Sequence, residues 1–207
     1  MNPISFDAAY EIERSRLTTF FRLIILIPWL IWVTLYGLAA FVVVFIAWFA
    51  LLFTARYPTG MYNFVAGYVR LSARVYAYAA LLTDEIPSFS GDPEPNYPVE
   101  VDVAAPQEHY NRAKTFFKII LYFPQALIGG YGFVIIVQAA AFISWVRILF
   151  TGKQSTTMHE ALLVSAAYLI RSNGFLLLVT EAHPRALDLP SYQPPADAPG
   201  LPETAVG

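Results

Sequence analysis

The chain has 207 residues, of which 57% are hydrophobic and only 14% are charged, whereas charged residues make up roughly a quarter of an average soluble domain. The formal net charge of −2 argues against nucleic acid as a partner, and the absence of cysteine excludes disulfides, thiol catalysis and thiolate metal sites. This composition favours a membrane protein over a soluble one.

The N-terminal segment is acidic before it is basic, with Asp7, Glu11 and Glu13 preceding the first arginines. A secretory signal peptide begins basic and becomes apolar early, so we expect an uncleaved chain. An apolar run then extends from Leu23 to Phe53, 31 residues without a charge. Uncharged runs longer than about 18 residues are typical of membrane segments, and this length argues against a buried helix pair in a soluble protein.

A segment without helix breakers follows, from Met61 to Leu82, and we expect it to form an amphipathic helix at the membrane interface. Arg70 and Arg74 lie on one face of this helix, and the second half of the chain keeps an equivalent, Arg171. Arginines in such a helix either reach out to lipid headgroups or line a pore; ordinary snorkelling favours the headgroups.

The next stretch, residues 83–108, holds seven acids, no base and several prolines, and is predicted to be a surface connection. Within it PVEVD, from Pro98, alternates apolar and acidic residues and is a candidate short strand. PISFD, from Pro3, resembles it, and we expect the two segments to pair.

The second half of the chain repeats the first. TTFFRLIILIP, from Thr18, recurs as KTFFKIILYFP, from Lys114, at an offset of 96. Farther on, Trp48 matches Trp145 at an offset of 97. We therefore predict two tandem copies, residues 1–92 and 93–187, followed by a disordered proline-rich tail at 188–207.

The change of offset lies between the matched prolines and tryptophans, where a turn absorbs an extra residue more easily than a helix does. GGYG (129–132) in the second copy and TLYG (34–37) in the first indicate a turn there. Each apolar run is therefore predicted to be a helical hairpin, kinked at Pro28 or Pro124. A hairpin with helices of about 20 residues either spans the bilayer with both helices or is a re-entrant wedge that does not cross it. The helix length favours spanning.

Basic residues flank both runs at both ends, and such residues concentrate on the cytoplasmic side. They include two more candidates for headgroup or pore contacts, Arg22 and Lys118. We expect both ends of each hairpin inside, which makes the repeats parallel, related by an axis along the membrane normal. The predicted fold is an all-α integral membrane protein with short strands, multi-pass in a bacterial inner membrane, with both termini cytoplasmic.

No pattern of catalytic residues is present. The three histidines are scattered, and no metal site, nucleophile with its base, phosphate loop or dinucleotide fingerprint is found. Acids at Asp84, Glu85 and Glu181 follow the amphipathic helices; ligand roles are conceivable, but helix ends and linkers explain them more simply. We expect no enzyme activity and no cofactor.

WFALLFTARYPTG (48–60), with LTDEIPSF and YPVEVDV downstream, resembles a family of bacterial membrane proteins, domain of unknown function 4389, frequent in actinobacteria. The family form reads LFTGRYP, so Ala55 replaces the usual glycine; the second copy keeps Gly152 but loses Tyr-Pro. The resemblance covers nearly the whole chain and implies a membrane location and a bacterial source. It supplies no catalytic residues.

Two functions compete. The first is a non-enzymatic scaffold or accessory subunit, oligomeric or part of a membrane complex, with lipids as partners. The second is a small channel or transporter with a path between the copies. A path requires polar groups facing inward at mid-membrane depth, and only Gln138 and Thr34 are candidates. That scarcity favours the scaffold.

Overall fold

The computed structural model describes residues 3–125 and 130–183, and the predicted tail at 188–207 lies outside them. The described chain is mostly helical with one short strand pair. Its elements are β1 (Ile4–Ala8), α1 (Arg16–Thr54), α2 (Thr59–Ala79), β2 (Val99–Val103), α3 (Arg112–Gln125), α4 (Tyr131–Thr151) and α5 (Thr156–Leu176).

The two strands pair with each other, as the sequence predicted. β1 and β2 are antiparallel, and the middle residue of each strand, Phe6 and Val101, are partners. These two residues are also equivalent in the two copies. An antiparallel pair centred on equivalent residues has a local two-fold axis perpendicular to the sheet. The strand pair therefore lies on a pseudo-two-fold axis that relates the copies.

Hydrogen bonds between the copies follow the same symmetry. Arg14 N–H donates to the Gly152 carbonyl (2.9 Å), and Tyr110 N–H donates to the Ala55 carbonyl (2.9 Å). In the same way Trp48 Nε1 donates to the Thr115 carbonyl (3.2 Å), and Trp145 Nε1 donates to the Thr19 carbonyl (3.1 Å). The start of α1 thus lies beside the end of α4, and the end of α1 lies beside the start of α3.

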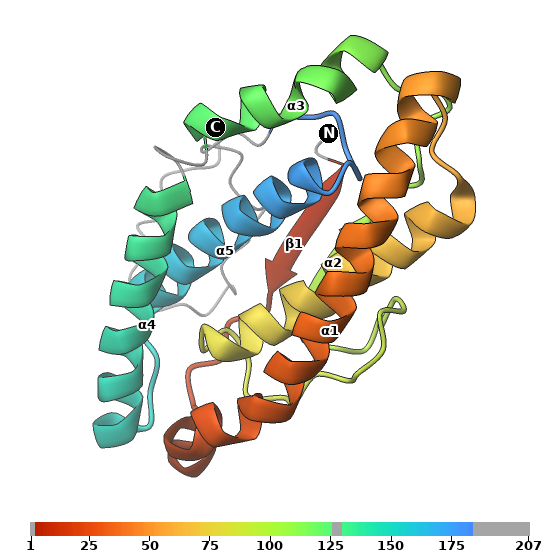
Figure 1. Ribbon diagram of the computed structural model, residues 1–207. Helices are drawn as coiled ribbons and strands as arrows, with labels where there is room; N and C mark the ends of the chain where they lie inside the picture. Colours follow the sequence, from red (N-terminus) through yellow and green to blue (C-terminus); the bar gives the residue numbers. More distant parts are fainter. Residues whose placement is uncertain (1–2, 126–129, 184–207) are drawn as a thin grey trace, which may run out of the picture.

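The elements form three layers, with α2 and α5 in the middle. β2 packs on α2 and β1 packs on α5, while α1 packs on α2 and α4 packs on α5 (Figure 1). The inner face of the sheet, including Ile4 and Phe6, joins the apolar core. Its outer face is polar: Ser5, Glu100 and Asp102 are exposed. The sheet and the outer helices are thus on opposite sides of the central pair.

The first predicted hairpin is wrong, because α1 is one continuous helix of 39 residues. Gly37, which we interpreted as part of a turn, instead lets α1 approach α2 closely. A Cβ at position 37 would lie 3.0 Å from the Tyr68 hydroxyl, and the neighbouring Tyr36 hydroxyl donates to the Phe64 carbonyl (3.0 Å). The glycine therefore serves helix packing, and the helix continues through it.

In the second copy the apolar run is divided between two helices, since α3 ends at Gln125 and α4 begins at Tyr131. Tyr131 and Gly132 of the predicted GGYG turn are helical, and residues 126–129, which include its first glycine, lie outside the described residues. The helices do not lie side by side as a hairpin would require: α3 packs on α1 and α5, and Figure 1 shows α4 leading away from α3 at a wide angle. Pro28 lies inside α1 and Pro124 inside α3, and the expected kinks stay a prediction.

The helices expected at the interface occupy the core instead. α2 and α5 contact each other, and each has more than half of its residues buried. Their buried side chains, including Ala66, Ala73 and Ala166, belong to one apolar core cluster. The sequence pattern correctly indicated helices in both copies, but their peripheral position was wrong, because α1, α4 and the sheet cover them.

Candidate functional site

A basic side chain near the start of α1 and another near the start of α3 are buried at equivalent places, and these are two of the five basic residues singled out by the sequence. Arg22 lies in the second turn of α1 and is 2% exposed; Lys118 lies in the second turn of α3 and is 5% exposed. Each reaches the C-terminal end of the core helix of its own copy, α2 for Arg22 and α5 for Lys118. Both therefore lie within the protein.

The first-copy site is closed by an ion pair. Arg22 Nη2 binds Asp84 Oδ1, and Nη1 donates to the carbonyls of Tyr78 and Thr83, the latter at 2.9 Å. The guanidinium also lies over the Tyr78 ring, 4.4 Å from its centroid. Asp84 Oδ2 accepts a hydrogen bond from Ser15 N–H (2.8 Å), so both of its oxygens are occupied. Asp84 thus joins the start of α1 to the end of α2.

The second-copy site has the same frame and a different cation. Lys118 Nζ donates to the Thr180 carbonyl (2.7 Å) and lies 4.5 Å from the centroid of the Phe175 ring. Glu181, the equivalent of Asp84, accepts a hydrogen bond from Asn111 N–H (2.6 Å). Among the described residues Lys118 forms no ion pair with a carboxylate. Burial lowers the pKa of Lys118 to about 7, and the nearby charge of Glu181 offsets part of this shift.

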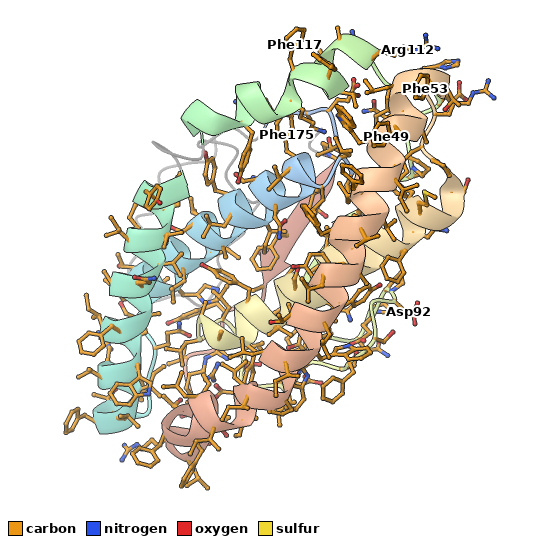
Figure 2. The ribbon with its side chains drawn as sticks, viewed as in Figure 1. Phe49, Phe53, Asp92, Arg112, Phe117 and Phe175 are labelled. Carbon is orange, nitrogen blue, oxygen red and sulfur yellow. The ribbon has the colours of Figure 1, made fainter. Side chains whose placement is uncertain are left out.

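A pocket of about 160 Å³ opens beside Lys118. Figure 2 shows one of its walls, Phe175, between α3 and α5. The other lining residues come from α3 and from the segment after α5: Lys114, Thr115, Lys118, Glu181 and His183.

The arginines of the core helices have structural partners. Arg74 is 2% exposed; its guanidinium binds Glu94 Oε1 (2.8 Å) and donates to the carbonyls of Ser90 and Asp92. These contacts fasten the connection between the copies to α2. Arg171, also buried, donates through Nε to the Ile4 carbonyl (3.2 Å) and so ties α5 to β1. Neither side chain extends to the surface, as snorkelling would require.

The remaining candidates lie nearer the surface. Arg70 is half-buried on α2. Thr34 is exposed, and its hydroxyl donates to the Leu30 carbonyl one turn earlier in α1 (2.7 Å). Gln138 is exposed on α4. The structure therefore does not bring Thr34 and Gln138 together between the copies. No group of three or more His, Asp or Glu suited to a metal ion occurs within residues 3–125 and 130–183.

Sequence reasoning missed the roles of Asp84, Glu181 and the two tryptophans. It treated the acids as helix-end chemistry, whereas they connect the start of one helix to the end of another. The signal was present in the repeat, because both acids and both tryptophans occupy equivalent positions. His159 was also missed: it is fully buried, its ring packs on Tyr10 with centroids 5.1 Å apart, and Nε2 lies 3.2 Å from the Ala8 carbonyl.

These features define a helical protein of two tandem copies, related by a pseudo-two-fold axis, with Arg22 and Lys118 buried at equivalent places. A family model described as Domain of unknown function (DUF4389) matches residues 16–91 and again residues 112–187. Together the two matches cover more than half of the chain, so the protein belongs to this family, with two copies in tandem. No match was found among curated proteins or among solved structures.

Proposed function

We propose that this protein is a non-enzymatic scaffold inserted into one leaflet of a bacterial inner membrane from the cytoplasmic side. The observation that carries the proposal is the apolar surface of the outer helices. α1 and α4 are both long and apolar enough to cross a membrane, yet only 17% and 22% of their most apolar windows are buried. Exposed side chains of this kind in water would be a strong liability to aggregation.

The pseudo-symmetry supports an orientation for this surface. The outer face of the sheet carries exposed carboxylates, Glu100 and Asp102, at one end of the two-fold axis. Unpaired carboxylates are costly in hydrocarbon, so this end of the axis belongs in water. The axis then runs along the membrane normal, and the two copies are parallel.

This orientation favours insertion over crossing. A two-fold axis along the normal places the starts of α1 and α3 at one depth. Because the end of α1 lies beside the start of α3, α1 begins and ends at that same depth. A continuous helix of 39 residues is about 58 Å long, against about 30 Å for the hydrocarbon core, which also fits a helix lying in the membrane plane. Basic residues at both ends of α1 suit a single, cytoplasmic side.

The packing between the copies supports a scaffold over a channel. α2 and α5 are in contact and contribute apolar side chains to one buried core cluster, whereas the mid-membrane candidates Thr34 and Gln138 are exposed. We propose that the protein organises lipids or protein partners at the membrane, as an oligomer or as a subunit of a complex. Flux of ions or small solutes through liposomes containing the purified protein, altered by Arg70→Ala, would reverse this ranking.

Cysteine labelling tests the orientation, and the cysteine-free chain makes it clean. Glu13 precedes α1 and Glu108 lies near its end, and both are exposed. Single cysteines at these positions are treated with a membrane-impermeant thiol reagent in intact cells and after lysis. We expect both to be protected in intact cells and both to be labelled after lysis. Labelling of only one of them in intact cells would mean that α1 crosses the membrane and would overturn the in-plane proposal.

A further inference from the structure

The two cation sites differ in how completely their charge is compensated. In the first copy the Arg22 guanidinium has a carboxylate and two carbonyls as partners. In the second copy the Lys118 ammonium, which has three N–H donors, has one carbonyl and an aromatic ring. A buried ammonium is costly unless it is paired and hydrogen-bonded. The second site therefore holds a cation, as the first does, but no carboxylate bound to that cation.

Glu181 does not take the place of Asp84. One Asp84 oxygen accepts a hydrogen bond from Ser15 N–H at the start of α1, and the other binds the planar guanidinium of Arg22. Glu181 Oε1 is held by Asn111 N–H at the start of α3, and no described contact joins its carboxylate to Lys118. Lys118 and Glu181 both line the pocket of about 160 Å³.

The charges around this pocket indicate which group it would accept. Two ammonium groups, Lys114 and Lys118, one carboxylate, Glu181, and the imidazole of His183 line it. With histidine counted as neutral, this leaves a single excess positive charge when Lys118 is protonated. A group with one negative charge neutralises this excess, whereas a dianion would leave one negative charge uncompensated beside Glu181. Thr115, in the same wall, is a further polar lining residue.

We propose that the second-copy pocket binds a phosphodiester, with one anionic oxygen on Lys118 where Asp84 meets Arg22 in the first copy. The source is either a phospholipid headgroup or a soluble phosphodiester. The lipid source rests on the proposed membrane location; binding of the phosphodiester itself does not. Phe116 and Phe117, exposed on α3 beside Lys118, provide apolar surface for the acyl chains of a lipid.

Thermal unfolding of the full-length protein in a non-ionic detergent tests the proposal. The probes are glycerophosphoglycerol, dihexanoylphosphatidylglycerol and inorganic phosphate, with dihexanoylglycerol as the phosphate-free control. We expect a phosphodiester to raise the midpoint, since a ligand that binds only the folded state stabilises it. Dihexanoylglycerol should have no such effect, and dianionic phosphate should bind more weakly. Stabilisation by the soluble diester alone, or only by the lipid, identifies the source.

Two variants locate the site. Lys118→Met keeps the length of the side chain and removes the charge, and should weaken phosphodiester binding by about tenfold to a hundredfold. Lys153→Met removes an exposed cation that does not line the pocket and should leave affinity unchanged. No stabilisation of the wild type by either phosphodiester, or equal affinity in Lys118→Met and the wild type, would overturn the proposal.

A measurement on the wild type remains decisive if Lys118→Met does not fold. We expect most of the Lys118 side chains to be neutral at pH 8, because burial lowers the pKa to about 7. A bound anion favours the charged form, so binding should take up most of one proton per site. Calorimetric titration in two buffers with different ionisation heats measures this uptake. Binding without proton uptake would place the anion on an exposed lysine and reject the pocket. These readouts are independent of cysteine labelling, so either proposal can fail alone.

Discussion

The two copies have related sequences, yet the first builds one 39-residue helix where the second builds α3 and α4. The difference is matched in the core helices. α2 has Gly67 and Tyr68 facing the middle of α1, whereas the equivalent positions of α5 are Val164 and Ser165. In the first copy Gly67 lies against Tyr36, and Tyr68 lies against Gly37. These two contacts hold α1 against α2. The second copy lacks this arrangement, and its outer helix is divided.

The cation sites of the two copies also differ. Arg22 is always charged and has its carboxylate, so it is a structural element. Lys118 can lose its proton and faces a pocket. The comparison teaches that a duplicated site can keep the same helix positions in both copies and still differ in function. In the first copy a carboxylate of the chain pairs with the cation, and in the second the cation is left open to a ligand.

The largest expected effect comes from removing each cation in turn. Arg22→Met leaves the part-buried Asp84 carboxylate without its partner and should lower the free energy of unfolding by about 3 kcal/mol or more. Lys118→Met leaves no broken ion pair and should change it by less than about 1 kcal/mol at pH 7. Denaturant titration in a mild detergent measures both. Equal losses would show that the sites are equivalent and would remove the basis of the comparison.

A second prediction concerns His159, which stands where the first copy has Tyr62. Burial lowers the pKa of His159 to about 4, and the Arg14 charge adds to the shift. The unfolded chain then binds the extra proton at higher pH than the folded one. Stability should therefore fall as the pH decreases from about 6.5 to about 4, by up to about 3 kcal/mol from this residue.

The measurement is the difference between the wild type and His159→Gln, because carboxylates titrate in the same pH range in both proteins. The variant should lack this part of the pH dependence. Identical pH profiles for the two proteins would mean that His159 is protonated equally in both states, and would refute the assignment.

A third prediction concerns Gly67, which is replaced by valine, the residue at the equivalent position 164 of the second copy. A Cβ at position 67 would lie 2.7 Å from the Tyr36 hydroxyl and 3.5 Å from the Gly91 backbone. Gly67→Val should cost about 1–3 kcal/mol through overpacking. Gly60→Ala, in the first turn of the same helix and with nothing within 4 Å of the added Cβ, is the matched control. It should be neutral or slightly stabilising. Similar losses for both would refute the role of Gly67 in holding α1.

The smallest effects are expected at the tryptophans that join the copies. Trp48→Phe and Trp145→Phe each remove one hydrogen bond to a carbonyl of the other copy and should each cost about 1 kcal/mol. Because the two bonds are reciprocal, we expect the losses to be nearly equal. A large loss at one position only, measured in the same denaturant titration, would mean that the copies are joined asymmetrically.

The sequence by itself determined the duplication, the helical class and the strand pairing. These rest on local pattern: matched residues at a nearly constant offset, long apolar runs, and two short segments of alternating polarity. It also picked out Arg22, Lys118, Arg74 and Arg171, because charges are rare enough in this chain to stand out.

Only the tertiary structure decided what these residues do. A glycine in an apolar run favours a turn when considered alone, and Gly37 became a packing contact because a tyrosine of another helix lies over it. An arginine on a helix face predicts an exposed position. Arg74 is buried instead, because the acidic segment that contains Glu94, 20 residues later, folds over it. Both outcomes depend on partners distant in sequence, and local periodicity carries no information about them.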